Sequence, residues 1–487
     1  MFDAPHSPLL CDILKHSIDT PDKVALVEGQ NRITYSQLAA NIEHAARYLH
    51  SLDIKAGDRI LLAARKEVEF VYLYFAAHLL GVVNVVIDPA SPTDRLDYIK
   101  RIVKPVNMFG VGCASGQGFA FSDVDLQLGD EEKMDLPHVE SSSLADVMFT
   151  TGTTGMPKGV CLSHDNIAGS AANINGFIGT DNTDVEALGL PLSHSFGLGR
   201  LRCILAAGGT IVLVGNFANL KAFFTVMENE RVTGFGMVPA VWQYIKRLSG
   251  TRIGKFADQL RYIEVGSAAL PVEDKHLLME LFPSTRLCVH YGLTEASRAL
   301  FTELHADADC LDTIGRPVSS LVEVCILDED GKPMTDGQDG ELCVRGNMVA
   351  RSYFLPEDNH DAFFGDWFRT GDWGHRDISG RFYLTGRKKE LINVGGEKVS
   401  PATIEDAICS LGIADCACIA IPDPNGVLGE VPKAFLLNKG ENLPTIDELK
   451  AGLAQRLPAH EIPVEWEWID SIPRSSSGKI QRLKLKQ

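Results

Sequence analysis

Two apolar runs and the segment between them constrain the fold of this chain most. Ile60–Ala63 and Val82–Ile87 have the length and the aliphatic content of buried strands, and the apolar-rich segment that ends at Leu80 has the length of a helix. A strand, a helix and a second strand in this order predict a βαβ unit, which implies a parallel sheet. Further strands that alternate with helical segments are expected at Thr210–Val214, Gly234–Val238, Arg261–Val265 and Arg286–His290.

The pattern of the sequence changes near residue 322. Val322–Leu327 and Glu341–Arg345 flank the turn-rich segment Asp328–Gly340, which predicts an antiparallel section. The region after Arg387 has its own succession of elements. It comprises a turn at Gly395-Gly396, a helix opening at Ser400-Pro401, strands around Cys418–Ile421 and Ala434–Leu437, and a helix over Thr445–Leu457.

A chain of 487 residues exceeds what one hydrophobic core usually serves, so we expect at least two domains. The predicted fold is α/β, with a large N-terminal domain of mixed and parallel sheets with helices and an antiparallel section over residues 1–386. A small, mobile α+β domain is expected over residues 387–487. The boundary is placed where the hairpin pattern gives way to the compact C-terminal succession of elements.

Composition excludes several classes of protein. The net charge of −18 argues against a nucleic-acid partner, which would have to be approached through a basic field. No export signal and no apolar run of bilayer length are visible, and eleven scattered cysteines fit a reduced, cytoplasmic protein. Cys416 and Cys418 resemble a ligand pair for a metal, but their alternation within an apolar run favours strand packing. The oligomeric state, monomer or homodimer, stays open.

The segment Thr150–Gly159 contains almost no side chain that could pack in a core. It consists mainly of threonines and glycines, with one cation, Lys158. It follows a short apolar run that reads as a strand. Backbone N–H groups, threonine hydroxyls and a point charge together suit a polyphosphate, whose oxygens need many donors at once. A polar surface loop is the alternative, and the spacing does not match a Walker P-loop.

Four later segments carry reactive side chains in turns. Tyr291-Gly292-Leu293-Thr294-Glu295 follows a predicted strand, where open α/β sheets usually bind ligands. Downstream follow Thr370-Gly371-Asp372, Gly386-Arg387-Lys388-Lys389-Glu390 and the closing segment Pro473–Arg482, which contains Lys479. Each of them alone is as well explained by a solvated turn, or by a helix start at Thr294-Glu295.

Taken together in this order, the five segments are strongly specific. The chain resembles the adenylate-forming superfamily, which contains acyl-CoA synthetases, carrier-protein-loading adenylation domains and firefly-luciferase-like enzymes. The resemblance runs from about residue 145 to the C-terminus. It implies that a carboxylic acid attacks the α-phosphate of ATP to give an acyl-adenylate and pyrophosphate, and that a thiol then displaces AMP. ATP, Mg²⁺ and coenzyme A are the implied cofactors and cosubstrate.

The resemblance also implies a role for individual residues. The β- and γ-phosphates would be held by Thr150, Thr151, Gly152, Thr153, Thr154 and Lys158. Adenine would lie beside Gly266, Ser267, Ala268, His290, Tyr291 and Gly292, with Tyr291 on its face. Ribose would be held by Asp372 and Arg387, Mg²⁺ by Glu295, and a phosphate by Thr294. Lys479 would bridge the carboxylate and the α-phosphate.

In this family the C-terminal domain swings between the two half-reactions about a hinge, which matches Lys389 here. The swing would exchange Lys479 for the turn at Gly395 and Gly396, whose small residues let a pantetheine arm pass close to the backbone. A hinge has only to absorb a large change in backbone dihedral angles, which a lysine does as well as most residues.

The segment Pro191–Gly197 separates the branches of the family. Members that activate amino acids carry an aspartate that matches Gly197, so substrates with an α-amine are disfavoured. His194 would lie near the acyl entrance, with a core histidine as the alternative. The acyl pocket is expected to be lined by Gly197, Leu198, Met237, Pro239, Ala296 and Arg298.

Three arginines lie near this expected pocket. Arg200 and Arg202 are expected on helix faces, snorkelling to solvent. Arg298, three residues after Glu295, is the better candidate for a substrate contact, because a buried guanidinium needs an acceptor that a second polar group of the substrate would supply.

The predicted function is an AMP-forming acyl-CoA synthetase that acts on a small carboxylic acid without an α-amine. A stand-alone ligase that loads an acyl carrier protein is the alternative within the family. A non-catalytic nucleotide-binding relative is less favoured, because Lys479, Glu295, Asp372 and Arg387 are all present.

Overall fold

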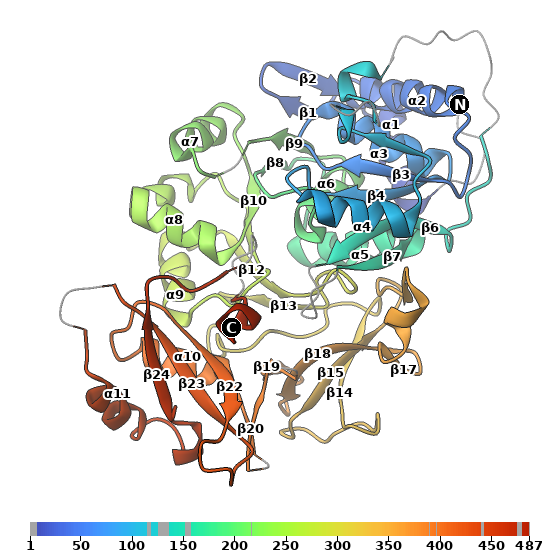
Figure 1. Cartoon of the computed structure of the whole chain (residues 1–487). Helices are drawn as coiled ribbons and strands as arrows, with labels where there is room; N and C mark the ends of the chain where they lie inside the picture. Colours follow the sequence, from blue (N-terminus) through green and yellow to red (C-terminus); the bar gives the residue numbers. More distant parts are fainter. Residues whose placement is uncertain are drawn as a thin grey trace. The chain divides into compact units, whose positions relative to one another are not determined.

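The computed structural model describes residues 7–113, 118–124, 136–150, 157–215, 217–388, 390–395, 397–439, 443–474 and 480–486. The chain divides into two compact units, Met1–Val324 with Val344–Phe368 and Cys325–Cys343 with Arg369–Gln487. Each unit is treated by itself below (Figure 1). The boundary expected after residue 386 stays a prediction.

A six-stranded sheet of the first unit contains the βαβ unit expected from the sequence. Its order is β16-β7-β6-β4-β3-β5, and β5, β3, β4 and β6 run parallel to one another. The expected unit is β3 (Arg59–Ala63), α3 (Val68–Leu79) and β4 (Val83–Ile87). The remaining strands are β5 (Asn107–Phe109), β6 (Leu144–Thr150), β7 (Lys158–Ser163) and β16 (Ser352–Tyr353).

An eight-stranded sheet forms the other half of this unit, in the order β13-β12-β11-β10-β8-β9-β1-β2. The strands from β12 to β1 run parallel, and β13 and β2 are antiparallel edge strands. The expected strands are confirmed as β9 (Thr210–Leu213), β10 (Gly234–Met237), β11 (Tyr262–Val265) and β12 (Arg286–Tyr291). The others are β1 (Val24–Glu28), β2 (Asn31–Thr34), β8 (Val185–Leu188) and β13 (Leu300–Glu303).

Helices form three layers around the two sheets (Figure 1). One core joins residues of both sheets to the helices α1 (Pro8–Asp19), α2 (Tyr35–Ser51), α3, α5 (His164–Ile178) and α6 (Ser195–Ala206). The opposite face of the eight-stranded sheet packs on α7 (Leu220–Asn229), α8 (Pro239–Ser249) and α9 (Val272–Leu281). The opposite face of the six-stranded sheet packs on α4 (Thr93–Val103). Open α/β sheets usually bind ligands at the carboxyl ends of their parallel strands, so a site is expected at those ends.

A five-stranded sheet contains the strands in which the chain passes from one unit to the other. Its order is β14-β15-β18-β17, with β19 on β18. The strands are β14 (Glu323–Leu327), β15 (Gly340–Arg345), β17 (Phe363–Phe364), β18 (Trp367–Arg376) and β19 (Phe382–Arg387). The hairpin section expected near residue 322 is thereby found as β14 and β15.

The rest of the second unit is the small α+β succession expected from the sequence. Strands β22 (Cys416–Pro422), β23 (Glu430–Leu437) and β24 (Glu465–Ile469) form one sheet, and β20 (Ile392–Val394) pairs with β21 (Glu397–Val399). The helix α10 (Pro401–Cys409) opens at the expected Ser400, whose hydroxyl accepts from the Thr403 N–H. Cys416 and Cys418 are buried in β22, so strand packing is confirmed.

One expected helix is shorter than predicted. The helix α11 (Ile446–Leu453) ends four residues before Leu457. The N–H groups of Arg456 and Leu457 both donate to the Leu453 carbonyl, 2.8 Å each, in a closing turn. Pro458 follows, and the residue before a proline is disfavoured in the helical region.

Candidate functional site

The hairpin β6–β7 holds the ends of the predicted phosphate loop. Thr150 and Lys158 are direct partners in its antiparallel register, and the Thr150 hydroxyl donates to the Lys158 carbonyl at 3.4 Å. Thr151, Gly152, Thr153 and Thr154 lie outside the described residues. The loop between the partners starts at the carboxyl end of β6, as the sequence predicts for a ligand-binding turn.

Lys158 and Glu295, which belong to different motifs, meet at the side chain of Tyr353. The Lys158 ammonium lies 4.9 Å from the centre of the Tyr353 ring, and 3.2 Å from a carboxylate oxygen of Asp358. The Tyr353 hydroxyl donates to Glu295 Oε1 at 2.6 Å. The Glu295 carbonyl accepts from the Ala350 N–H at 2.7 Å, so the backbone of this glutamate is also held.

This arrangement fits a magnesium ion that takes most of its ligands from phosphates. Mg²⁺ usually keeps several waters and binds through one or two carboxylates plus substrate phosphates. Among the described residues no group of three potential ligand side chains converges, so a site built from protein side chains alone is not found there. Glu295 offers one oriented carboxylate, which is the kind of ligand that a nucleotide-bound Mg²⁺ takes from a protein.

The segment that follows β12 is shaped by a buried histidine. His290 Nδ1 lies 2.8 Å from Glu264 Oε1, and a Cβ added to Gly266 would lie 2.1 Å from the imidazole. Ser267 has a positive φ of 74°, which turns the chain sharply after β11, and Ala268 is exposed. No helix starts at Thr294, so the Thr294-Glu295 segment is an irregular turn rather than a helix start. Because the His290 imidazole approaches this closely, only glycine fits at position 266.

Tyr291, Gly292 and Thr294 are each partly exposed beside this turn. Gly292 is a second position of close approach, because a Cβ there would lie 2.4 Å from the Arg298 backbone nitrogen. Because β11 and β12 are parallel neighbours, the residues that follow them lie at the same edge of the sheet. The predicted adenine-binding residues thus lie at neighbouring strand ends.

A cluster of buried charges lies behind this edge. Arg298 is 1% exposed and Arg200 is fully buried, and both pair with Glu264, at 3.0 and 3.5 Å. Arg200 also pairs with Glu186, and Tyr262 donates to the same carboxylate. Burial alone would raise the pKa of Glu264, but Arg298, His290 and Arg200 hold it well below its ordinary value.

The cluster corrects the expectation for Arg298. All five of its N–H donors have acceptors inside the protein: Nε and Nη2 donate to Glu264, Nη1 to the Ser195 carbonyl and the Ser297 hydroxyl, and Nη2 also to the Phe196 carbonyl. The premise that this guanidinium needs a substrate as its acceptor is wrong. Its positive φ of 60° and its ring contact with Phe196 fit a structural role.

The expectation that Arg200 and Arg202 snorkel to solvent is also wrong. Arg202 is 5% exposed and pairs with Asp146, while its Nε donates to the Tyr74 hydroxyl at 2.8 Å. Burial would raise the pKa of Asp146, but Arg202 and His78 hold it at about 2. Both arginines are buried because each pairs with a buried carboxylate: Arg202 with Asp146 on β6, and Arg200 with Glu186 on β8.

On the acyl side, the structure brings several predicted residues to the ends of β8 and β10. His194 is exposed and precedes α6, so the alternative of a core histidine is wrong. Met237 ends β10, Pro239 begins α8, and Leu198 and Ala296 are buried. A Cβ on Gly197 would lie 2.2 Å from the Pro191 carbonyl oxygen, so this position faces backbone rather than open space. The lack of an aspartate at 197 therefore says little about the substrate.

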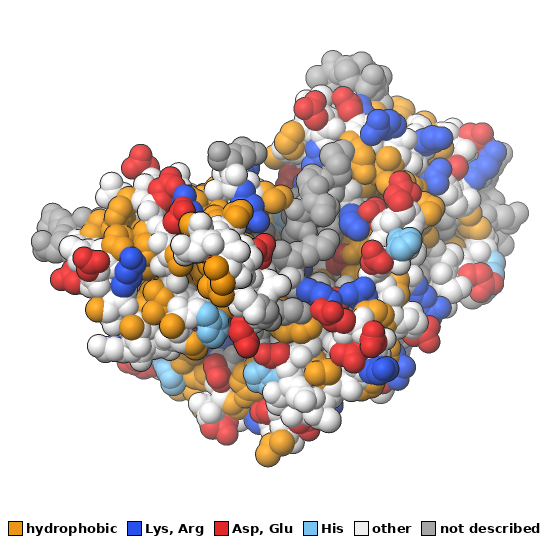
Figure 2. All heavy atoms as spheres, turned by 60° about the horizontal axis from the view of Figure 1, so that its bottom comes forward, with side chains coloured by type: hydrophobic (Ala, Val, Ile, Leu, Met, Phe, Trp, Pro, Cys, Tyr) orange, Lys and Arg blue, Asp and Glu red, His pale blue; other side chains and the backbone are white. Residues whose placement is uncertain are grey.

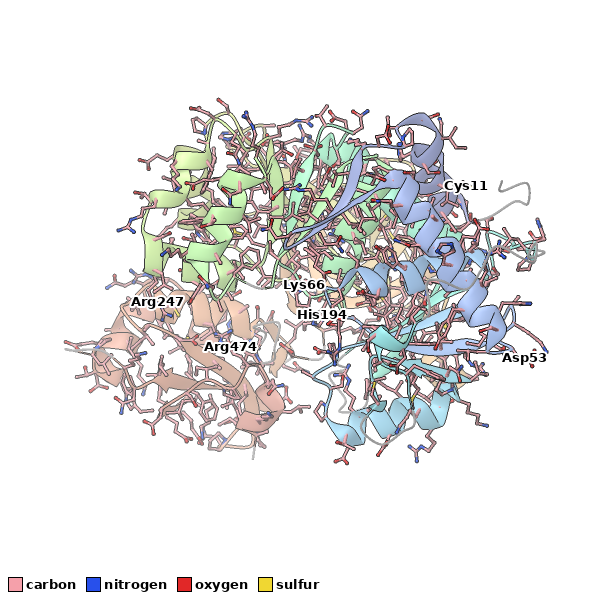
Figure 3. All side chains as sticks on the ribbon, turned by 90° about the horizontal axis from the view of Figure 1, so that it is seen from above. Cys11, Asp53, Lys66, His194, Arg247 and Arg474 are labelled. Carbon is pink, nitrogen blue, oxygen red and sulfur yellow. The ribbon has the colours of Figure 1, made fainter. Side chains whose placement is uncertain are left out.

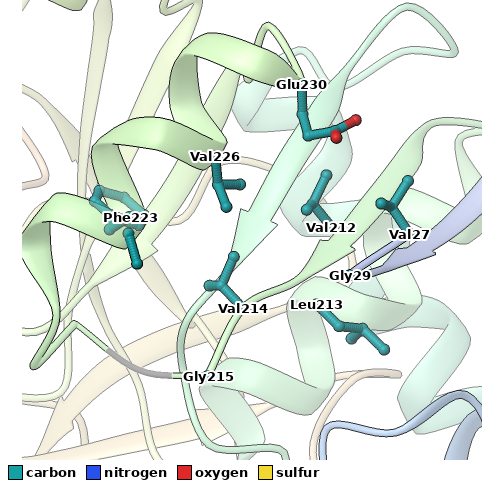
Figure 4. Close-up of a pocket in the computed structure, with 10 residues that line it drawn as sticks. Val27, Gly29, Val212, Leu213, Val214, Gly215, Phe223, Val226 and Glu230 are labelled. Carbon is teal, nitrogen blue, oxygen red and sulfur yellow. The ribbon is translucent and has the colours of Figure 1, made fainter. Parts of the chain in front are cut away.

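A small apolar cavity lies elsewhere on the eight-stranded sheet. It has a volume of about 200 Å³ and is lined by the ends of β1 and β9 and by α7, with Glu230 as its charged residue (Figure 4). Glu230 pairs with Arg32 at 2.8 Å. Because β9 is four strands from β12 in the sheet order, this cavity is not the predicted site.

The predicted ribose pair is brought together in the second unit. Asp372 and Arg387 are direct partners of β18 and β19, and Arg387 Nε lies 2.6 Å from Asp372 Oδ1. Asp372 is 4% exposed, and its N–H donates to the Thr370 hydroxyl at 3.0 Å. Glu341, which the sequence analysis did not single out, accepts from Arg369, Lys388 and the Gly371 N–H.

The ends of the closing segment are fixed in the same unit. Arg474 and Ile480 form an isolated antiparallel bridge, and Arg482 makes a two-pronged pair with Glu405 at 2.7 and 2.8 Å. Lys479, the hinge candidate Lys389 and Gly396 lie outside the described residues. Gly395 has a positive φ of 61°, as a tight hairpin between β20 and β21 requires.

Three residues that hold these groups were not predicted from the sequence. Tyr353, Asp358 and Glu341 contact predicted site residues, but none of them stands in a recognisable motif. The one available signal is weak: Glu341 opens an apolar strand run, Leu342 to Val344, and a carboxylate there needs partners.

The chain belongs to the family of AMP-binding enzymes. The family profile matches residues 15–354, and the profile of the C-terminal domain of AMP-binding enzymes matches residues 403–479. The predicted resemblance to adenylate-forming enzymes is thereby confirmed.

Curated relatives of the chain are CoA ligases. It is 30% identical to a 2-succinylbenzoate–CoA ligase of Bacillus velezensis over 96% of both chains. It is 33% identical to a sulfoacetate–CoA ligase of Cupriavidus necator over 72% of this chain and 68% of the relative. It is 29% identical to a feruloyl-CoA synthase of an Amycolatopsis species over 96% of both.

Solved structures confirm the predicted fold class. The o-succinylbenzoate CoA synthetase of Bacillus subtilis, in complex with its acyl-adenylate intermediate, has a TM-score of 0.86 and 25% identity over 98% of both chains. The same synthetase has been solved with ATP and a magnesium ion, with a TM-score of 0.87. Across the described part of the present chain, no helix has both the length and the apolarity to cross a membrane.

Proposed function

We propose that this protein is an AMP-forming acid–thiol ligase, which converts a small carboxylic acid, ATP and coenzyme A into an acyl-CoA, AMP and pyrophosphate. The observation that carries the proposal is that Lys158 and Glu295, from motifs far apart in the sequence, both contact Tyr353, which supports a common phosphate and magnesium site. The family and the CoA-ligase relatives support the same reaction.

In the first half-reaction, a carboxylate oxygen of the acid bonds to the α-phosphorus and the bond to the β-phosphate breaks, which releases pyrophosphate. This step needs positioning and neutralisation of charge more than covalent help. The β- and γ-phosphates are held by Thr150, Thr151, Gly152, Thr153, Thr154 and Lys158. Lys479 bridges the carboxylate and the α-phosphate. A magnesium ion held by Glu295 supplies further charge neutralisation, and Thr294 donates to a phosphate.

The nucleoside is held at two places. Gly266, Ser267 and Ala268 border the adenine, with His290, Tyr291 and Gly292 at the neighbouring strand end. Asp372 accepts from the ribose hydroxyls, and Arg387, paired with it at 2.6 Å, orients that carboxylate. The pairing of these two residues across β18 and β19 supports their joint role.

In the second half-reaction, the thiol sulfur bonds to the acyl carbon, its proton leaves to solvent, and the bond from that carbon to the AMP oxygen breaks. We propose that residues 387–487 move as a unit about Lys389 between the two steps. The movement replaces Lys479 by the Gly395-Gly396 turn, past which the pantetheine arm reaches the adenylate. Gly395 supports this role with its positive φ and its lack of a side chain.

The acid is one without an α-amine. Succinylbenzoate, sulfoacetate and ferulate, the acids named for the relatives, share this property. His194, Gly197, Leu198, Met237, Pro239 and Ala296 form the acyl side of the site. Free CoA is the preferred thiol, with a carrier-protein phosphopantetheine as the alternative acceptor. The eleven free thiols fit a reducing compartment, for which we propose the cytoplasm.

Nucleic acid is not proposed as a partner. The net charge is −18, and acidic and basic side chains are interspersed on the face drawn in Figure 2.

The decisive experiment is a screen of carboxylic acids that follows pyrophosphate release with CoA, with a carrier protein that bears a free phosphopantetheine thiol, or with neither. Turnover with CoA supports the ligase, and turnover only with the carrier supports the alternative. The Lys479→Ala variant should lose adenylation by a few powers of ten but still transfer pre-made acyl-adenylate to CoA. Nucleotide binding without pyrophosphate release from any acid would show a non-catalytic protein, and an equal loss of both half-reactions would exclude the movement about Lys389.

A further inference from the structure

A half-buried lysine stands at the edge where both sheets of the first unit end. Lys66 follows β3, and its ammonium donates to the Gly189 carbonyl at 2.8 Å, just beyond the end of β8. No carboxylate lies within 4.0 Å of this ammonium among the residues that the structure describes. Burial lowers the pKa of Lys66 to about 8, and no neighbouring acid acts in the opposite direction.

Other lysines of this unit show what is unusual about Lys66. Burial also lowers the pKa of Lys23 and of Lys275, but Asp181 and Asp184 oppose it at Lys23 and Asp312 opposes it at Lys275. The buried arginines of α6 have carboxylate partners as well. The cost of withdrawing a cation from water without an opposite charge is large, so proteins normally supply one. Lys66 is thus a cation prepared for an anion from outside.

The strands that precede Lys66 and its acceptor Gly189 lie a few strands from those that lead to the predicted site residues. In the sheet order, β3 is two strands from β6, which leads to the phosphate loop, and β8 is three strands from β12, which leads to Glu295. With neighbouring strands about 4.8 Å apart, these separations are roughly 10 and 14 Å. Gly189 also begins the turn that leads to His194, and both Lys66 and His194 are labelled in Figure 3.

We infer that Lys66 is a specificity-determining residue that binds a second carboxylate at the far end of the substrate acid. An ammonium group has three N–H donors, of which Gly189 uses one, so two remain for the two oxygens of a carboxylate. The phosphates of ATP are held at the β6–β7 hairpin two strands away. The inference rests on the proposed function and deepens it: the preferred substrates are extended dicarboxylic acids rather than plain fatty acids.

The test compares acids of equal length that differ only in the distal group: adipate with hexanoate, and suberate with octanoate. The wild-type protein should have the higher kcat/KM for each diacid. Lys66→Met should lower kcat/KM for the diacids about tenfold or more, mainly through KM, because a charge-assisted hydrogen bond is lost. The monoacids should be used as well as before or better. Lys66→Arg, which keeps the charge, should retain much of the preference.

Two controls keep the outcome clear. Lys55→Met removes an exposed lysine that lies 3.1 Å from Asp53, and it should change neither ratio. In the wild-type chain, suberate with ATP should protect Lys66 from reductive methylation, read by peptide mass spectrometry, and octanoate should not. An unchanged diacid-to-monoacid ratio in Lys66→Met, or equal methylation with both acids, would overturn the inference alone. If the wild-type protein makes thioester from no acid at all, the proposed function fails and this inference with it.

Discussion

The charges behind the eight-stranded sheet and the charges at the carboxyl edge of the six-stranded sheet are satisfied in different ways. Behind the sheet, every N–H of Arg298 has an acceptor within the protein. At the edge, the Lys66 ammonium has one backbone acceptor among the residues that the structure describes. The Lys158 ammonium pairs with the Asp358 carboxylate, and a third of the Lys158 side chain is exposed. Cations that have all their partners inside the protein stabilise the fold, and those left with unused donors are available to a ligand. A cationic side chain therefore serves one of two purposes, according to how many acceptors the fold supplies.

The largest effect that this comparison predicts is on stability. Arg298→Leu leaves Glu264 buried with fewer partners, which should cost about 3–5 kcal/mol of the free energy of unfolding. Urea unfolding followed by circular dichroism measures the loss. Arg345→Leu is the matched control, because its pair with Glu323 is exposed and should be worth less than about 1 kcal/mol. A stable Arg298→Leu protein with an altered acid preference would instead show that the Arg298 guanidinium contacts the substrate.

The next effect is on nucleotide binding. Arg387→Met removes the partner of Asp372, and we expect the KM for ATP to rise about ten- to a hundredfold, as the loss of a charged hydrogen-bonding group implies. Stability should change by less than about 1 kcal/mol, because the guanidinium is partly exposed. Steady-state kinetics with varied ATP measure it. Arg376→Met, which removes an exposed pair with Asp336, should leave the KM unchanged.

A smaller effect is expected at the magnesium site. Tyr353→Phe removes one hydrogen bond to Glu295 and should raise the Mg²⁺ concentration for half-maximal rate about tenfold. Titration of the rate with Mg²⁺ at saturating ATP measures this shift. Tyr383→Phe, which removes a hydroxyl 3.2 Å from Asp377, serves as the control. Equal Mg²⁺ dependence in wild type and Tyr353→Phe would mean that Tyr353 does not orient the ligand.

The smallest effect is a change in how stability depends on pH. Burial raises the pKa of Glu405 to about 7; Arg482 acts in the opposite direction, and Glu390 and Asp406 add to the rise. The native chain therefore holds a proton between the ordinary value of 4.5 and about 7 that the unfolded chain has released. Its stability falls as pH rises through that window, and Glu405→Gln should remove this part of the slope. Urea midpoints at several pH values measure the slope, and parallel curves for the two proteins would contradict the expectation.

Much of the fold could be predicted because its signals are local. The strand–helix–strand pattern of residues 59–88 and the cap at Ser400 depend on neighbouring residues only. The motif residues Asp372 and Arg387 were predicted to act together and are direct partners in a hairpin. The end of α11 was missed because the helical sequence pattern continues into the turn that closes the helix.

The environments of the arginines could not be predicted in this way. Arg200, Arg202 and Arg298 are buried because carboxylates of distant strands meet them, and pairings over such separations leave no periodic pattern. A signal was nevertheless present. Asp146, Glu186 and Glu264 each interrupt an apolar strand, and a buried carboxylate requires a cation. Tyr353 and Asp358, in contrast, lie in a segment without any such mark.

The close approach at Gly197 has a consequence for redesign of the protein. An aspartate placed there to capture an amino acid would meet the Pro191 carbonyl oxygen with its first side-chain atom, 2.2 Å away. At Gly199, two positions further, an added Cβ would lie 2.5 Å from the Arg298 guanidinium, so this position is closed as well. Positions 197 and 199 at the start of α6 therefore leave no space for a side chain that could bind a new substrate group. Laboratory evolution toward new acids should instead accumulate changes at the exposed His194 and at the half-buried Lys66.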